Sequence, residues 1–131
     1  MVTIKRICVL GLGYIGLPTA CLFATHGYTV TGVDTKQEVV DKINRGQVPF
    51  QEPGLNELLQ KALESHALVA KTEPEPADVF LIAVPTPLVK EARMADLHYV
   101  REAARSVAPC LQSSNLVILE STVPPGTCEG L

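Results

Sequence analysis

The sequence predicts an α/β domain in which a doubly wound parallel sheet carries helices on both faces. Two features lead to this expectation. Short apolar segments alternate with amphipathic helical segments along the 131 residues, and the first apolar segment runs directly into a glycine-rich stretch at residues 11–16. Composition agrees, because 47% hydrophobic and 19% charged residues are typical of one folded domain. Strands that alternate with helices form a parallel sheet through right-handed crossovers.

The first strand, helix and strand are expected before residue 35. Residues 4–10 form a short apolar run typical of a central parallel strand. A segment rich in Ala and Leu follows the glycine-rich stretch and ends at Gly27, since glycine favours the position after a helix. Residues 28–34 are rich in β-branched side chains, which predicts a second strand that finishes with the carboxylate of Asp34.

Two further helices are expected before the third strand. Residues 36–45 place three branched aliphatic side chains on one face, and Gly46 ends the segment. A turn-rich connector with two prolines follows. Residues 54–66 then carry leucines at helical spacing, which predicts the next helix.

The rest of the chain continues the alternation. Residues 67–71 predict a short strand, and residues 77–85 predict a strong buried strand that is stopped by prolines. Residues 96–111 have the apolar spacing of a helix, and residues 115–121 predict a further strand. Residues 123–131 have the composition of a helix start, so we expect residues 1–131 to be one domain of a longer protein.

Charge and composition exclude several classes of protein. The formal net charge is -3, and no basic cluster exceeds the pair Lys5 and Arg6, which argues against a nucleic-acid partner. The longest apolar runs are about half as long as a membrane span, and no signal-peptide cleavage site precedes Gly11. We therefore expect a cytoplasmic protein without a membrane partner. The cysteines lack C-x-x-C spacing, so we expect reduced thiols and no metal site: Cys8, Cys21, Cys110 and Cys128.

The stretch GLGYIG fits the G-x-G-x-x-G pattern of a Rossmann-type dinucleotide-binding turn. Gly11 allows a tight turn out of the strand, Gly13 lets a pyrophosphate approach the backbone, and Gly16 lets the helix pack closely. The free N–H groups of the first helical turn then face the phosphates. The alternative, a glycine turn without a ligand, does not require the third glycine.

Asp34 lies 18 residues after Gly16, close to the ~20 expected for the carboxylate that binds the adenosine ribose. Its charge would repel a 2′-phosphate, which favours NAD over NADP. The alternative is that Asp34 caps the helix starting near Lys36, since Asp is a preferred N-cap residue. The two roles are compatible.

Two polar turns follow later strands. VPTP at residues 84–87 presents the hydroxyl of Thr86, and ESTVPPG at residues 120–126 presents Ser121 and Thr122. Ligands of open α/β sheets bind at the carboxyl ends of the strands, so we expect these residues to line one crevice. The alternative for VPTP is a simple strand terminator.

These motifs, in this order, resemble the amino-terminal domain of the UDP-glucose/GDP-mannose dehydrogenase family. The resemblance rests on GLGYIGLPTA, FQEPGLNELL, AVPTP and LESTVPPGT, and it covers essentially the whole chain. Within the family, the chain is most similar to the subfamily that oxidises UDP-N-acetyl-D-mannosamine. Many relatives have an arginine five residues after the ribose aspartate, where this chain has Val39. Two alternatives follow: the adenosine contacts are weaker here, or Lys36 takes the place of the arginine. The resemblance implies NAD contacts at Tyr14, Ile15, Asp34, Thr86 and Thr122.

The resemblance also implies an activity shared between two domains. The family oxidises the C6 alcohol of a nucleotide sugar to a carboxylate by two hydride transfers to NAD, through a thioester on the cysteine of a G-G-H-C motif. That motif is absent from residues 1–131, and neither Cys128 nor Glu120 has the context of a catalytic residue. We therefore expect no catalytic residue here and a UDP-sugar site that needs a substrate-binding domain outside this sequence.

The full-length protein is expected to be a homo-oligomer. Three alternatives remain open from the sequence: a non-catalytic NAD-sensing module, a UDP-N-acetylglucosamine or UDP-glucose 6-dehydrogenase, and a β-hydroxyacid dehydrogenase. The segments FQEPGLNELL and ESTVPPGT argue against the last of these.

Overall fold

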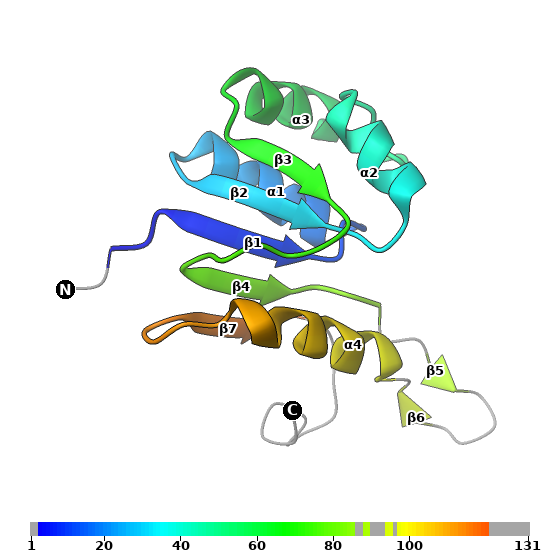
Figure 1. Cartoon of the computed structure of the whole chain (residues 1–131). Coiled ribbons are helices and arrows are strands. Elements are labelled where there is room, and N and C mark those ends of the chain that lie inside the picture. Colours follow the sequence, from blue (N-terminus) through cyan, green and yellow to red (C-terminus); the bar gives the residue numbers. More distant parts are fainter. Residues whose placement is uncertain (1–2, 86–87, 90–93, 96, 121–131) are drawn as a thin grey trace.

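A five-stranded parallel sheet with the strand order β3-β2-β1-β4-β7 forms the centre of the fold (Figure 1). The computed structural model describes residues 3–85, 88–89, 94–95 and 97–120. β5 (Leu88–Val89) and β6 (Met94–Ala95) form a separate antiparallel pair. The strands of the main sheet are β1 (Arg6–Leu10), β2 (Thr29–Val33), β3 (Leu68–Lys71), β4 (Val79–Ile82) and β7 (Leu116–Leu119).

Helices cover both faces of the sheet, as the sequence predicts. Figure 1 shows α1 behind the sheet and α4 in front of it. α3 packs along α1, α2 packs against β3, and α4 packs against β4. The helices are α1 (Gly16–Thr25), α2 (Gln37–Asn44), α3 (Leu55–Glu64) and α4 (His98–Val107).

The alternation of side chains in β1 separates two hydrophobic cores. Ile7 and Val9 face the core shared with α1, α2 and α3, whereas Cys8 and Leu10 face the core shared with α4. Burial raises the pKa of the Cys8 thiol to about 12 and that of Cys21 to about 11, so both stay protonated at neutral pH. Both cysteines are fully buried members of the core.

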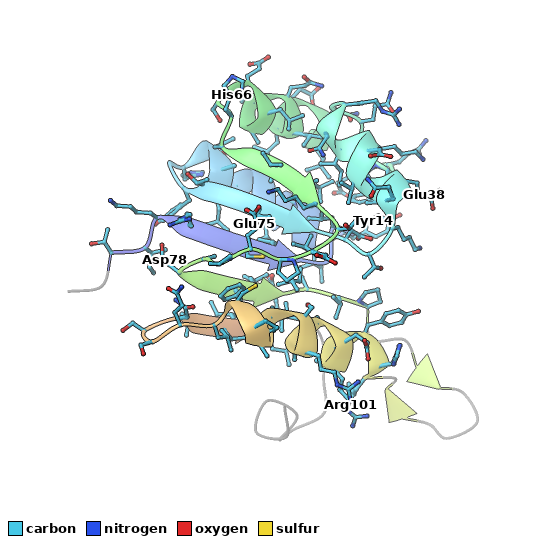
Figure 2. All side chains as sticks on the ribbon, in the orientation of Figure 1. Tyr14, Glu38, His66, Glu75, Asp78 and Arg101 are labelled. Carbon is cyan, nitrogen blue, oxygen red and sulfur yellow. The ribbon has the colours of Figure 1, made fainter. Side chains whose placement is uncertain are left out.

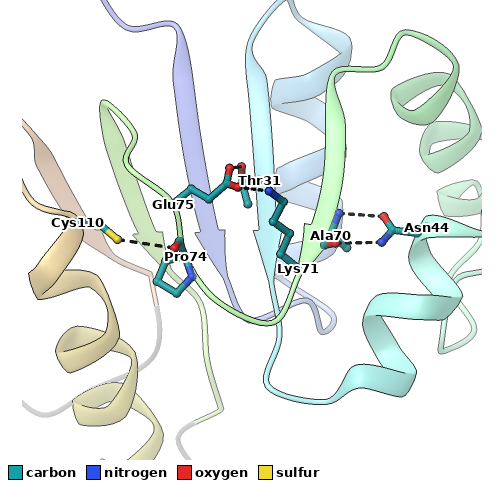
Figure 3. Close-up of polar contacts among 7 residues, drawn as sticks. All are labelled: Thr31, Asn44, Ala70, Lys71, Pro74, Glu75 and Cys110. Carbon is teal, nitrogen blue, oxygen red and sulfur yellow. Dashed lines mark hydrogen bonds and ion pairs between the residues drawn. The ribbon is translucent and has the colours of Figure 1, made fainter.

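The connection from β3 to β4 contains no helix. Residues 72–78, here called the strap, cross the face of the sheet that α4 also covers (Figure 3). Glu75 forms an ion pair with Lys71 and accepts a hydrogen bond from Thr31 Oγ1 at 3.4 Å. The hydrogen bond from Lys71 lowers the pKa of Glu75 most strongly, and the charge of Lys71, the hydrogen bond from Thr31 and the charge of Arg6 lower it further. Cys110 Sγ lies 3.7 Å from the Pro74 carbonyl oxygen and ties the strap to the end of α4.

The structure corrects several predicted boundaries. The helix expected over residues 96–111 ends at Val107 and continues as one 3-10 turn, Ala108–Cys110, because Pro109 has no N–H for the helical ladder. The β5–β6 pair was not predicted, since two-residue strands leave no periodic signal. The helix start expected at residues 123–131 lies outside the described residues. Within the described part of the chain, no helix is long and apolar enough to cross a membrane.

Candidate functional site

The candidate site lies at the carboxyl ends of β1 and β4, two neighbouring strands in the centre of the sheet. After β1 the chain turns toward α1 on one face, and after β4 it leads to α4 on the other face. Such a divergence opens a crevice in doubly wound sheets. The glycine-rich turn is fixed between the strand ends: Gly11 N donates to Val33 O at 2.8 Å, and Ala83 N donates to Leu10 O at 2.8 Å.

Gly11 and Gly16 are required by close backbone approaches. Gly11 has a φ of +96°, and a Cβ there would lie 2.5 Å from the carbonyl oxygen of Ala83. A Cβ on Gly16 would lie 1.6 Å from the carbonyl oxygen of Gly11. The predicted roles of a tight turn and a close helix start therefore have a direct geometric basis. The contact partner of Gly16 is the turn itself rather than the body of the sheet.

Gly13 faces open space. A Cβ added there would meet no atom within 4 Å, and the backbone of Gly13 is not in the left-handed region. The left-handed residue of the turn is Gly11 instead, because the chain reverses at that point. Tyr14 and Ile15 are exposed, with 68% and 53% of their surfaces accessible, and Figure 2 shows Tyr14 near the carboxyl end of the sheet.

Three backbone N–H groups indicate that the turn binds a ligand: those of Gly13, Tyr14 and Ile15. They have no hydrogen-bond acceptor among the described residues. Three N–H donors beside a surface free of side chains fit the oxygens of a diphosphate, and the dipole of α1 favours negative charge there. The described geometry is therefore compatible with the pyrophosphate of a dinucleotide.

Asp34 joins the glycine-rich turn to the start of α2. Its Oδ2 accepts a hydrogen bond from Leu12 N at 3.2 Å, and its Oδ1 accepts one from Lys36 N at 3.0 Å. The bond to Lys36 is a turn before the helix, since Lys36 is itself the N-cap of α2 and that cap has no side-chain hydrogen bond. Asp34 is therefore not the N-cap residue of α2, and the capping alternative is wrong. Each half-buried carboxylate oxygen has lone pairs left for the hydroxyls of a ribose.

Two contacts of the turn were not predicted from the sequence. The side chain of Leu12, only 2% exposed, packs on β2 where Gly32 leaves room, and a Cβ on Gly32 would lie 2.9 Å from Leu12 Cδ2. The ring of Phe50 lies 4.4 Å from the ring of Tyr14, centroid to centroid, with a 35° angle between the planes. A glycine inside a strand was the available signal for the first contact. No local signal indicated the second, because the two rings are 36 residues apart.

The remaining predicted contacts divide into two groups. Lys36 is exposed beside Asp34. Val39, at the position where many relatives have an arginine, is half-buried and packs α2 against the core. Thr86, Ser121 and Thr122 lie outside the described residues, as does Cys128. Glu120 is exposed at the end of β7, where its N–H donates to Ile82 O at 2.9 Å.

A groove of about 480 Å³ lies at the outer edge of the sheet, between α2 and the strap. The Asn44 side chain pairs there with the free edge of β3: it donates to Ala70 O and accepts from Ala70 N, both at 2.9 Å (Figure 3). None of the predicted cofactor residues that the structure describes lines the groove. It is therefore separate from the glycine-rich turn.

Comparison with known proteins identifies the family. The sequence profile of the UDP-glucose/GDP-mannose dehydrogenase family, NAD binding domain, matches residues 5–131. The chain belongs to this family. As its NAD-binding domain, the chain has NAD as its cofactor, and the dinucleotide-binding interpretation of the glycine-rich turn agrees with that assignment.

Relatives and solved structures of the family give the same assignment. The chain is 47% identical over 129 residues to UDP-N-acetyl-D-mannosamine dehydrogenase of Methanococcus vannielii. The aligned region covers 96% of this chain and 30% of the relative. It is 50% identical over 127 residues to NDP-N-acetyl-D-galactosaminuronic acid dehydrogenase of Ralstonia nicotianae, with 97% and 30% covered. The chain thus spans about 30% of the length of these family members.

A solved structure of UDP-N-acetyl-mannosamine dehydrogenase from Staphylococcus aureus matches this family member with a TM-score of 0.92 and 45% identity, covering 95% of this chain and 31% of that one. The GDP-mannose dehydrogenase of Pseudomonas aeruginosa matches with a TM-score of 0.89 and 34% identity, over 95% and 30%. The Rossmann-type fold predicted from the sequence is therefore confirmed.

Proposed function

We propose that this chain is the cofactor-binding part of an NAD-dependent nucleotide-sugar 6-dehydrogenase that acts on a UDP-N-acetylhexosamine. The names of the relatives support this proposal: a UDP-N-acetyl-D-mannosamine dehydrogenase is 47% identical over 129 residues. Bound NAD supplies the hydride acceptor for oxidation of the C6 alcohol. The chain supplies binding and orientation, and the sugar pocket, the nucleophile and any subunit contacts belong to a region outside residues 1–131.

The cofactor contacts in this proposal follow the polarity of the crevice. The N–H groups of Gly13, Tyr14 and Ile15 bind the pyrophosphate, because they lie together without acceptors among the described residues. The Asp34 carboxylate binds the adenosine ribose, since it is already held beside the turn by Leu12 N. Thr86, Ser121 and Thr122 are proposed to bind NAD as the carboxyl-end residues of the next two strands.

A second substrate is favoured by a specific observation. The Ralstonia relative, named as an NDP-N-acetyl-D-galactosaminuronic acid dehydrogenase, is 50% identical over 127 residues. The names of the two relatives contain an N-acetylhexosamine and the uronic acid of one. The shared chemistry is therefore a nucleotide-linked N-acetylhexosamine, and the mannosamine configuration is our first proposal.

The test combines the chain with the substrate-binding region encoded by its gene. NADH absorbance is followed with UDP-N-acetylmannosamine, UDP-N-acetylgalactosamine, UDP-N-acetylglucosamine and UDP-glucose, each at the same concentration. We expect the highest kcat/KM with UDP-N-acetylmannosamine and two NADH per sugar. A preference for UDP-glucose would contradict the N-acetylhexosamine proposal. NAD binding without turnover of any sugar would support a sensing module instead.

A further inference from the structure

The contact between Tyr14 and Phe50 joins the glycine-rich turn to a distant connector. Tyr14 is 68% exposed, and its ring lies 4.4 Å from that of Phe50 at an interplanar angle of 35°. Phe50 belongs to residues 45–54, here called the connector, which lead from α2 to α3. The connector contributes nothing else to the turn that the described contacts reveal.

Phe50 is held firmly enough to act as a support. It is half-buried and packs against the core beneath α1 and α3. The near end of the connector is tied down by Gln60 Nε2, which donates to Gly46 O at 3.1 Å. The far end enters α3 through Gly54, whose φ is +81°, and Leu55 N donates to Glu52 O at 3.2 Å.

Tyr14, by contrast, has little else to fix it. The residue lies before the first helical residue Gly16, and its own N–H has no acceptor among the described residues. An exposed loop side chain samples several rotamers unless a neighbour restricts it. The peptide group before Tyr14 is held because Leu17 N donates to Gly13 O at 3.1 Å, whereas the peptide group after Tyr14 has no hydrogen bond among the described residues. Packing against a fixed ring restricts that sampling, because aromatic pairs add stabilisation beyond their buried area.

We propose that Phe50 is a positioning residue for the dinucleotide: through the ring of Tyr14 it holds the N–H groups of the glycine-rich turn in the orientation that binds the pyrophosphate. This inference rests on the proposed role of the turn. Preorganised donors bind an anion more tightly than donors that must be ordered on binding. The connector thereby acts on cofactor affinity without touching the cofactor.

Phe50→Leu tests the proposal in the 131-residue chain, because leucine keeps an apolar side chain in the core and removes the ring. We expect the Kd for NAD in titration calorimetry to rise about 2- to 10-fold. Phe50→Tyr retains the ring and should restore the affinity. Adenosine lacks the phosphates, so its Kd in ligand-observed NMR should not change.

Phe23→Leu is the matched control. Phe23 is also half-buried against the same core and also contacts a tyrosine, Tyr28, at a centroid distance of 5.7 Å. It lies near the carboxyl end of α1, away from the turn. Both leucine variants should lower the melting temperature, whereas only Phe50→Leu should weaken NAD binding. Equal NAD affinity in the two variants would overturn the proposal.

A variant on the exposed side of the pair covers the case in which Phe50→Leu does not fold. Tyr14→Leu should fold and should by itself raise the Kd for NAD about 2- to 10-fold, because it also removes the contact between the rings. Where Phe50→Leu folds, the double variant should add nothing further, because both changes remove one contact. Additive losses, or no loss in Tyr14→Leu, would also overturn the proposal. Failure of the unmodified chain to bind NAD would instead refute the proposed function itself.

Discussion

Asp34 combines an observed structural role with the recognition role that we propose for it. Its two oxygens accept hydrogen bonds from Leu12 N and Lys36 N. These bonds fix the carboxylate at the carboxyl end of β2 before any ligand is present. A residue held in this way costs less entropy when a ribose binds to it, which is the physical basis of preorganised recognition.

Asp34→Asn separates charge from hydrogen bonding. An amide oxygen still accepts one of the two N–H bonds, but the negative charge is lost. We expect NAD to bind more weakly and the discrimination against NADP to shrink, because a 2′-phosphate no longer meets a like charge. Asp34→Ala should in addition lower the free energy of unfolding by about 1–3 kcal/mol, since it leaves two N–H groups unpaired. Calorimetric titration and urea unfolding measure the two effects, and an undiminished preference for NAD in Asp34→Asn would refute the charge argument.

We expect Gly13→Val to lose NAD binding and Gly11→Ala to lose stability, for different physical reasons. At Gly13 an added Cβ meets no atom within 4 Å, so the variant should fold and lose NAD binding by occupying the space of the phosphates. At Gly11 even one methyl group lies 2.5 Å from the Ala83 carbonyl oxygen, at a φ of +96°. We expect Gly11→Ala to lower the melting temperature. A folded Gly13→Val, by circular dichroism, that binds NAD normally would show that the phosphates bind elsewhere.

At the scale of the elements, Asp78 fixes the start of β1 to the strap. Its Oδ2 accepts hydrogen bonds from Lys5 N and Arg6 N, both at 2.9 Å, and lies at the opposite end of the sheet from Tyr14 (Figure 2). These bonds lower the pKa of Asp78, the Arg6 bond most strongly. A carboxyl group with a lowered pKa stabilises the fold above its unfolded pKa, and that stabilisation is lost as the pH falls through its folded pKa.

Asp78→Asn is therefore expected to lower the melting temperature at neutral pH. The difference from the unmodified chain should shrink as the pH is lowered below about 4, where the carboxyl group of the unfolded chain becomes protonated. Thermal unfolding followed by circular dichroism between pH 7 and pH 3 measures this. A difference that stays constant over the whole range would show that the charge of Asp78 contributes nothing.

The sequence predicted those elements whose signals are local. The observed bounds of β1, α1 and β2 lie within two residues of the predicted ones, because apolar runs and Gly27 mark these segments directly. Features that depend on distant residues were not predictable in this way. The path of the strap over the sheet is one such feature, because Glu75 accepts a hydrogen bond from Thr31, 44 residues away, and no periodicity predicts this contact.

The candidate site shows the same division. The roles of Gly11 and Gly16 followed from the motif, since only glycine tolerates the backbone approaches now described. The hydrogen bonds that Asp34 accepts from Leu12 N and Lys36 N were not predicted, because they depend on how the glycine-rich turn and the start of α2 lie beside the end of β2. The Tyr14–Phe50 contact was not foreseen, because it depends on how α3 carries the connector back over α1.

At the scale of the whole molecule, the activity that we propose is divided between this chain and a region outside it. It covers about 30% of the length of its relatives. Hydride transfer needs the sugar carbon held against the nicotinamide with a base in reach, and positioning of this kind accounts for roughly 7–11 kcal/mol of a barrier. The crevice at the ends of β1 and β4 supplies the cofactor side of that arrangement.

Residues 1–131 alone should therefore bind cofactor without oxidising a nucleotide sugar. Incubation of the pure chain with NAD and UDP-N-acetylmannosamine, UDP-N-acetylglucosamine or UDP-glucose should give no NADH absorbance above the blank. A Cys128→Ser variant serves as the control for adventitious thiol chemistry. Turnover that survives in this variant would show that catalytic groups lie within the chain and would refute the proposed division between domains.

The central claim is that the turn at residues 11–16 and the carboxylate of Asp34 form a site for NAD. Titration calorimetry of the unmodified chain with NAD and with NADP, under identical salt and pH, tests it most directly. Because a 2′-phosphate would lie against the Asp34 carboxylate, we predict that NADP binds about tenfold or more weakly than NAD. Equal affinities for the two dinucleotides, or no binding of either, would contradict the account.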